Sequence, residues 1–340
     1  MAISGQVLAG VLEGYKKESL DGNFAAVPLI DFWKKAGGIK EGSGRNIVCP
    51  VQVAEHSATA DLISGREAIG LTVSDTLKRL VFDWSRGVDR VIVTGKDKDE
   101  YASDKAMINY VKDLLRNVQD SQLRGINRKL ILNSGAAWSE LTSFNGAAST
   151  GGGATTNVFR PQAYGSQTGV IGTLDRALYG NALQHQYQTA GADFSVNGRS
   201  QLSKVIRSAQ RQTVGGGYPH LVLMSDAGFN NLFDTIVSNE RFTGQGQAVM
   251  TGPRSIEFMS VPVAFDPDMP VGTTVEEYTA YVLNLLDGMN LDYIKWMELG
   301  PWVDFLPAGM DGEGCTLVSQ VGLAVKHLPS SGVLVNGNTN

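Results

Sequence analysis

The sequence has few of the residues that build metal-bound or disulfide-bonded frameworks. Only two cysteines, Cys49 and Cys315, occur among 340 residues, and they lie far apart. They form neither a metal-binding spacing nor a disulfide framework, so we expect two small buried side chains in a reducing compartment. The four histidines are scattered along the chain. These patterns favour neither a metalloprotein nor a disulfide-stapled secreted domain.

Long apolar runs are also missing. No window approaches the roughly 18 uninterrupted apolar residues that a membrane-spanning helix needs. Residues 1–17 have no basic start and only a short apolar run interrupted by glycine, so we expect no signal peptide. We therefore expect a chain that contacts no membrane and is made in the cytoplasm.

Charge is scarce and mixed in sign. Charged residues make up 19% of the chain, below the usual share of about 25%, while the 40 glycines exceed the usual share of about 7%. The net charge is −5, and no block of five like charges occurs. A protein that coats nucleic acid usually carries a basic tail or stripe, so no nucleic-acid arm is predicted. A turn-rich chain with little charged surface is often covered by partners.

Recognisable catalytic motifs are absent as well. The chain contains neither a P-loop, a dinucleotide-binding fingerprint, a nucleophile elbow nor a zinc-protease motif. Asp266 and Asp268 lie beside prolines, where we expect them to cap a turn rather than bind a metal. The acidic residues after Gly95 lack the glycine and glutamate of a calcium loop. We therefore expect no cofactor, no metal site and no enzymatic activity.

What the sequence does have is a long amphipathic helix, predicted over residues 103–131. Its apolar stripe has helical spacing and is interrupted once by a polar patch; it comprises Met107, Val111, Leu114, Leu115, Val118, Ile126 and Leu130. Ser103 is a good N-cap. At 1.5 Å per residue the helix would run on the order of 40 Å. Gly125 costs about 1 kcal/mol relative to alanine and is the expected position of a bend.

Two extended features precede this helix. Residues 1–40 place apolar side chains in an irregular segment, which needs either the chain's own core or a neighbouring subunit to lie on. Residues 45–54 and 71–84 alternate as strands around the polar stretch 55–70, which predicts a long hairpin. Pro50 marks an edge strand. A two-stranded hairpin is marginal alone, and no sequence-local helix is available to cover it.

The chain after the helix divides into three parts. A glycine-rich, loop-rich middle contains one short helical signal at 174–183. Helices are predicted at 200–213 and 226–242, with strands at 220–225, 255–267 and 278–286. Together they indicate a compact α+β lobe over 198–295. A last strand, 317–325, returns the chain to the long helix.

The order of these elements resembles the major capsid protein of tailed double-stranded DNA bacteriophages. The most specific part is the succession FMSVPVAFDPDMP, YVLNLLDGMNLDYIKWMELG and CTLVSQVGLAVKHLPSSGVL. The stretch IVCPVQVAEHSATADLISGREAIGLTVSDTLKRLVFDW is similar to the extended loop of that family. The resemblance covers residues 3–335.

The resemblance implies an α+β, tailed-phage major capsid fold. Its expected parts are an N-terminal arm (1–44), an extended β-hairpin loop (45–87), a peripheral domain (88–197) with the spine helix 103–131, an axial domain (198–295) and a return to the peripheral domain with a C-terminal tail (296–340). The arm and loop would reach neighbouring subunits through Phe24, Phe32, Trp33, Glu55, Arg66 and Glu67. The loop tip 55–68 contains no lysine, so no lysine–asparagine crosslink is expected.

The function implied by the resemblance is structural. Hexamers and pentamers of the chain would form the icosahedral capsid of a virion, assembled in the host cytoplasm. Its partners would be copies of itself, a separate scaffolding protein, a portal, a decoration protein and packaged DNA, the last bound weakly and non-specifically. Two alternatives stay open: a tail-tube or sheath subunit, and an enzyme whose site in the 198–295 lobe would use Asp226, Asp266 and His220.

Overall fold

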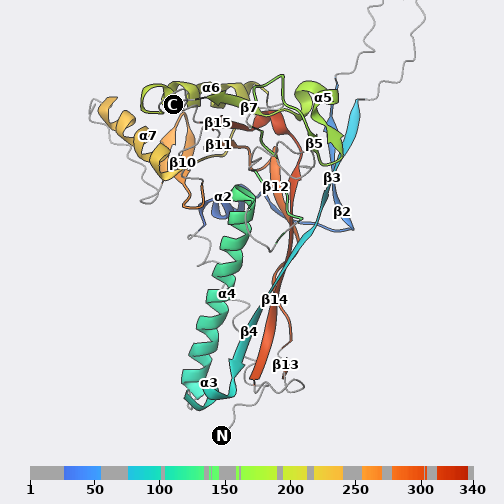
Figure 1. Cartoon of the computed structure of the whole chain (residues 1–340), viewed down its shortest axis with the longest axis vertical. Helices are drawn as coiled ribbons and strands as arrows, with labels where there is room; N and C mark the ends of the chain where they lie inside the picture. The colour runs from blue at the N-terminus through green and yellow to red at the C-terminus, as the bar shows by residue number, and fades with distance from the viewer. Residues whose placement is uncertain are drawn as a thin grey trace, which may run out of the picture.

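A computed structural model describes the chain over residues 27–54, 76–100, 104–133, 138, 140–144, 158–160, 162–189, 194–212, 218–239, 255–269, 278–301, 303–304 and 312–335. These residues form an elongated α+β body (Figure 1). A six-stranded sheet covered by helices lies at one end, and a long helix runs beside long strands toward the other end.

The long helix α4 (Asp104–Leu132) confirms the predicted stretch 103–131. Its first half packs into a separate small core through Met107, Val111 and Leu115, with Leu114 and Val118 partly buried beside them. Its second half enters the main core through Leu123, Ile126, Leu130 and Ile131. The polar patch between the two halves contains the buried Gln119 and Gln122. The interruption of the apolar stripe therefore marks the boundary between two cores.

Gly125 of α4 lies beside the ring of Trp138. A Cβ atom added there would lie 3.4 Å from the indole nitrogen of Trp138, which is an ordinary van der Waals contact. The packing at this position therefore does not by itself require a glycine. The bend expected at Gly125 stays a prediction.

A five-stranded sheet lies beside the first half of α4. It consists of β1 (Ile39–Glu41), β4 (Ser85–Thr94), β12 (Met289–Leu299), β13 (Val303–Asp304) and β14 (Gly312–Val325). The long strand β14 is antiparallel to β12 along one edge and to β4 along the other. The short helix α3 (Gly95–Glu100) connects β4 to α4. Strand β14 includes the predicted strand 317–325, which indeed packs on the long helix through Leu317.

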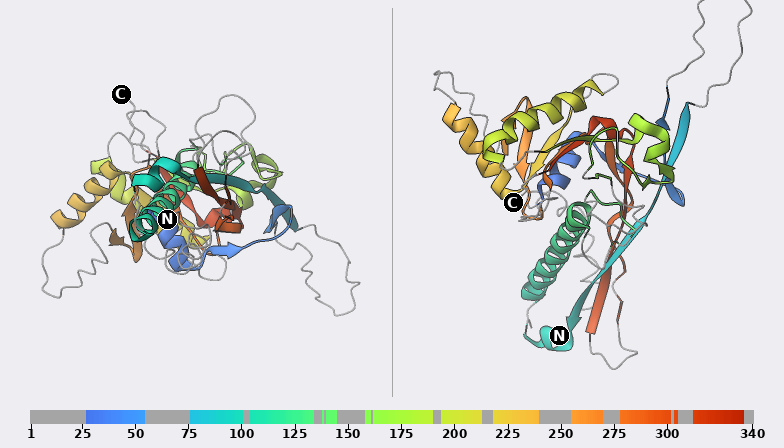
Figure 2. Two further views of the ribbon diagram at one scale, coloured as in Figure 1. Left: turned by 90° about the horizontal axis from the view of Figure 1, so that it is seen from below. Right: turned by 45° about the horizontal axis from the view of Figure 1, so that its top comes forward.

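The second sheet has six strands in the order β7, β15, β11, β8, β10, β9. Their bounds are β7 (Gln186–Thr189), β15 (Gly332–Val335), β11 (Tyr278–Leu283), β8 (Leu221–Met224), β10 (Val261–Phe265) and β9 (Ser255–Phe258). Helices α6 (Phe194–Arg211) and α7 (Asp226–Asn239) cover one face (Figures 1 and 2). The other face belongs to the main core. Adjacent residues of β8 divide accordingly: Val222 faces the helices and Leu223 faces the main core.

The extent of this sheet differs from the predicted lobe 198–295. The sheet takes β7 and β15 from outside that range, and it excludes β12, which pairs in the five-stranded sheet. Strand β15 is parallel to β7 and antiparallel to β11. Strand pairing joins segments that are distant in the sequence, and local periodicity carries no information about such pairing. The segment 174–183, predicted as a short helical signal, contains β6 (Leu174–Asp175), α5 (Arg176–Tyr179) and the 3₁₀ turn η2 (Gly180–Leu183). Strand β5 (Val170–Ile171) precedes this segment. A second 3₁₀ turn, η4 (Leu328–Ser330), precedes β15.

The predicted hairpin is present as β2 (Asn46–Gln52) and β3 (Leu77–Asp83), an antiparallel pair. The stretch predicted as its polar tip, 55–70, lies outside the described residues. The inner face of the β2–β3 pair is buried in the main core through Ile47, Cys49, Val51, Leu80 and Phe82. Strand β14 lies directly beneath, since a Cβ on Gly322 would overlap the Ile47 side chain. The cover that no sequence-local helix supplies therefore comes from β14 of the same chain.

Part of the predicted N-terminal arm belongs to the folded body. Helix α2 (Pro28–Ala36) buries Leu29, Ile30 and Trp33 completely, and β1 pairs with β12. The indole Nε1 of Trp33 donates a hydrogen bond to the carbonyl oxygen of Met289 at 3.2 Å. Leu29, Ile30 and Trp33 therefore do not lie on a neighbour, whereas the reach of the rest of the arm onto neighbouring subunits stays a prediction. These apolar side chains found their surface within the chain itself, which was the other possibility that the pattern left open.

Candidate self-assembly surfaces

The five-stranded sheet exposes apolar residues on the face opposite α4. Val88 and Ile92 of β4 are 49% and 47% exposed, whereas Val91 and Val93 alternate inward. Val88 is paired with Val318 of β14, so this exposed valine has an apolar neighbour on the adjacent strand. Within the described residues, the second edge of β4 pairs with no strand. Exposed apolar side chains beside an open strand edge are typical of a contact surface.

The outer face of the hairpin is a second apolar surface. Val48 is 52% exposed and Leu77 is 63% exposed, on the side opposite the buried Ile47 and Phe82. Val48 lies directly across from Val81 in the ladder. The hairpin stands at one edge of the body, away from α4 (Figures 1 and 2). It thus presents apolar side chains on a part of the subunit that projects outward.

The predicted contact residues divide into three groups. Phe24, Glu55, Arg66 and Glu67 lie outside the described residues. Phe32 is partly buried against the main core, and the ammonium group of Lys35 lies 5.5 Å from its ring centroid. Trp33 is fully buried and packs against Phe144 with ring centroids 5.9 Å apart. The proposed intersubunit contact is therefore wrong for Trp33, since a side chain inside the subunit's core cannot touch a neighbour.

The exposed apolar residues of β4 and of the hairpin were not predicted as contact residues from the sequence. The signal for Val88 and Ile92 was present, because residues 88–93 carry apolar side chains on both alternating faces. A strand of that kind is expected to be covered on both sides. The structure covers only one of those sides in a single copy, which turns the second face into a candidate contact.

Asp266 and Asp268 tie the six-stranded sheet to α4. The backbone N–H of Asp268 donates to Asp266 Oδ1 at 2.9 Å, which confirms the predicted turn. The side-chain amide of Asn127 also donates to Asp266 and, at 2.9 Å, to Asp268. Arg128 pairs with Asp268 at 3.0 Å. Burial raises the pKa of Asp266 to about 6, against the opposing effect of these hydrogen bonds. The pair is a structural junction that holds a buried carboxyl group.

The acidic residues after Gly95 form a helix cap. Both the backbone N–H and the hydroxyl group of Thr94 donate to Asp97 Oδ2, and the N–H of Asp97 donates back to Thr94 Oγ1. This reciprocal arrangement is a capping box at the start of α3. The hydrogen bond from the Thr94 backbone is the main cause that lowers the pKa of Asp97. In the described part of the chain, no group of three or more potential ligands gathers to hold a metal ion.

The polar groups considered for an enzymatic site each have a different partner. Asp266 accepts from Asn127, Asp226 accepts from Asn230 at 3.4 Å, and the backbone N–H of His220 donates to the carbonyl oxygen of Leu283.

The two cysteines are free and buried, as predicted. Burial raises the pKa of both thiols to about 11, which disfavours the reactive thiolate. None of the described helices is long and apolar enough to cross a membrane.

No protein-family model and no curated protein matches the sequence. Solved structures do match it. The cyanophage A-1(L) capsid is 14% identical with a TM-score of 0.62, over 92% of this chain and 93% of that one. The capsid of the native GTA particle is 13% identical with a TM-score of 0.58, over 89% of both chains. A structure from Mycobacterium phage Adephagia is 12% identical with a TM-score of 0.52, over 91% of both chains. The chain therefore has the α+β fold of tailed-phage major capsid structures.

Proposed function

We propose that the chain is the major structural subunit of a tailed-phage capsid. Copies of it would assemble as hexamers and pentamers into an icosahedral shell around a double-stranded DNA genome. The observation that carries this proposal is the end-to-end likeness to capsid chains, which spans 92% of this chain and 93% of the cyanophage chain. A likeness over both whole chains leaves little room for a different arrangement of domains.

The exposed apolar surfaces support the same proposal. A subunit that worked alone would gain nothing from uncovered side chains such as Val88, Ile92 and Leu77. In a shell, neighbouring copies would cover them, and burial of apolar surface stabilises such contacts by about 25 cal/mol per Å². We place these surfaces between copies of the chain, together with the hairpin of residues 45–87 as the extended loop.

The remaining parts of the proposal follow from a structural role in a virion. The shell would be assembled in the host cytoplasm with a separate scaffolding protein, and it would carry a portal and a decoration protein. With a net charge of −5, its contact with the packaged genome would be weak and non-specific. The chain would act without a cofactor and without catalysis. A tail-tube or sheath subunit is the alternative structural role.

Electron microscopy and sedimentation of the expressed chain test this function. The chain would be produced alone and together with its scaffolding protein, and the particles would be separated by size. Closed icosahedral particles of megadalton mass are the expected result. Rods or stacked rings would support the tube or sheath alternative instead, and small soluble oligomers in both conditions would contradict the shell.

A further inference from the structure

Helix α6 carries a row of positive charge on its outer face. Its 18 residues include four basic residues and no acidic one. The basic residues are all exposed: Arg199, Lys204, Arg207 and Arg211. The opposite face is completely buried on the six-stranded sheet through Leu202, Val205, Ile206 and Ala209, as the sequence predicted. The helix is thus amphipathic with a polar side of a single sign.

Helix α7 carries the opposite sign. Its 14 residues include two acidic residues and no basic one. Asp226 and Asp234 are both exposed, and Phe233 between them is 46% exposed. Its inner face packs beside α6 through Leu232, Phe229 and Ile236. One lobe therefore presents a basic outer helix next to an acidic outer helix that carries an exposed aromatic ring.

Stability of the isolated subunit explains only part of this pattern. Arg211 in the last turn of α6 and Asp226 in the first turn of α7 are favourable for the helix dipoles. The helix dipoles do not account for the charges of Lys204, Arg207 and Asp234. Like charges three and four residues apart on a helix repel each other. Among the described residues, none of these three side chains joins an ion pair, so the described part of the same copy supplies no opposite charge for the α6 row.

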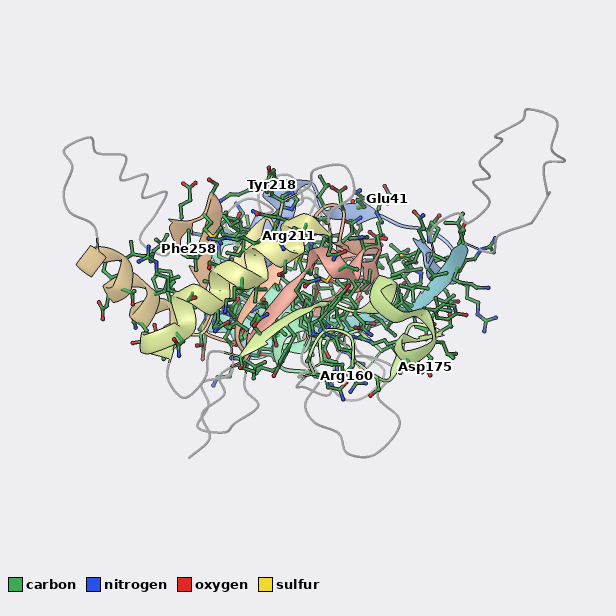
Figure 3. The ribbon with its side chains drawn as sticks, turned by 90° about the horizontal axis from the view of Figure 1, so that it is seen from above. Glu41, Arg160, Asp175, Arg211, Tyr218 and Phe258 are labelled. Carbon is green, nitrogen blue, oxygen red and sulfur yellow. The ribbon has the colours of Figure 1, made fainter. Side chains whose placement is uncertain are left out.

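The position of the two helices suits a ring of identical copies. Viewed down the shortest axis of the molecule, α6 lies along the upper border of the lobe and α7 along its outer side border (Figure 1). From above, α6 crosses the surface toward the labelled Arg211, and α7 forms the far end (Figure 3). The two helices therefore form two sides of a wedge-shaped lobe. Rotation of copies about an axis at the tip of the wedge brings α6 of one copy toward α7 of the next.

The charged rows also match in length. Lys204 and Arg211 are seven residues apart, which is about 10 Å along a helix, and Asp226 and Asp234 are eight residues apart, about 12 Å. We propose that the outer face of α6 binds the outer face of α7 on the neighbouring copy of this chain, with Arg207 opposite Asp234 and Phe233 covered between them. This contact deepens the proposed function and rests on it, since it specifies how copies meet around the ring axis.

A charge exchange tests the contact. Arg207→Glu and Asp234→Arg would each place like charges at the interface, and each should lower the yield of closed particles about tenfold or more. The double variant restores opposite signs and should return the yield to within about threefold of the original protein. Lys96→Glu, on the exposed helix α3, is the matched control for a change of net charge and should assemble normally. Thermal unfolding of each variant checks that the subunit still folds.

Cysteine crosslinking gives a second measurement that does not depend on yield. The two native cysteines are buried. A chain carrying both Arg207→Cys and Asp234→Cys should form disulfide-linked pentamers and hexamers in its particles upon oxidation, whereas chains with one of the two substitutions should stay monomeric on a denaturing gel. A double-cysteine chain that stays monomeric in intact particles would overturn the contact.

The outcomes separate the contact from the function. If the original chain forms no particles, the proposed function fails. If both single charge variants assemble like the original chain, only the α6–α7 contact is overturned. If both are impaired and the double variant stays impaired, a copy of this chain is not the acidic partner of α6, which also overturns the proposal.

Discussion

The two sheets of this protein differ in how completely a single copy covers them. The six-stranded sheet is covered on one face by α6 and α7 and on the other by the main core. The five-stranded sheet is covered by α4 on one face and leaves Val88 and Ile92 exposed on the other. The first sheet is therefore buried on both faces within a single copy. The second is half of a structure that, in our proposal, other copies complete.

Helix α4 connects the two sheets through buried polar side chains. Gln122 donates to the carbonyl oxygen of Leu317 at 3.0 Å and accepts from the hydroxyl group of Ser319 on β14. One turn further on, Asn127 reaches Asp266 after β10. Buried polar groups are costly when unpaired, so these contacts fix the register of α4 against both sheets. The helix therefore fixes the position of the fully covered sheet relative to the half-covered one.

The largest predicted effect contrasts one residue from each sheet. Val282→Asp places a charge in the centre of the covered sheet and should cost about 4 kcal/mol or more of folding free energy, because the buried carboxylate has no partner. Val88→Asp changes an exposed position between two arginines and should cost about 1 kcal/mol or less. Urea denaturation measures both values.

Assembly should rank the same two variants differently. The Val88→Asp subunit should fold and yet fail to form closed particles, because a charge replaces an exposed apolar side chain at the proposed contact. Normal particles from this variant would mean that the exposed face of the five-stranded sheet is a free surface, and the contrast between the two sheets would lose its functional meaning.

A medium effect is expected where the hairpin crosses the five-stranded sheet. Gly322→Ala would push its new methyl group into Ile47 and toward Trp84. Overpacking of this kind costs about 1 to 3 kcal/mol. Ile47→Val removes the methyl group that clashes, so the combined variant should recover part of the loss. An additive loss in the double variant would show that the hairpin base is not held against Gly322.

The last predicted effect depends on pH and concerns Asp266. Its pKa is about 6 in the folded chain, above the ordinary value of 3.8, so proton binding favours the folded state. The stabilisation is complete below pH 3.8 and is lost as the pH rises through about 6. Asp266→Asn keeps a neutral group there, and its amide can donate to Asn127 Oδ1, a buried acceptor without a partner among the described residues. We expect a gain of about 1 to 3 kcal/mol at pH 7.5 and almost none at pH 4.

Thermal unfolding at the two pH values measures this difference. Asp113→Asn, on the exposed side of α4, is the matched control and should change stability by less than about 0.5 kcal/mol at either pH. Equal gains for Asp266→Asn at both pH values would show that the buried carboxyl group does not ionise in this range.

Much of the fold was readable from local patterns. The apolar spacing predicted α4 to within one residue at either end, and the buried set of α6 was identified residue by residue. The alternation around Pro50 predicted β2, and the turn at Asp266 and Asp268 was identified correctly. These features rest on contacts within a few residues, and side-chain periodicity records such contacts directly.

The candidate surfaces were less predictable. The apolar residues of 27–36 were compatible with a neighbour or with the chain's own core, and the complete burial of Trp33 decided for the core. Exposure of Val88 and Val48 depends on which faces the rest of the chain covers. The opposite signs of α6 and α7 are visible in the sequence, but their meaning as two sides of a wedge requires the arrangement of the helices in space (Figure 1).

The sequence by itself determined the elements of this protein: a long amphipathic helix, a hairpin, a lobe of alternating helices and strands, and a chain without a recognisable catalytic motif. Only the tertiary structure decided which segments share a sheet and which faces stay open. Strand β15 joins β7 and β11, and β14 covers the hairpin base, through pairings across long stretches of chain. Periodicity identifies the buried side of an element, whereas the element that buries it is selected by packing of the whole chain.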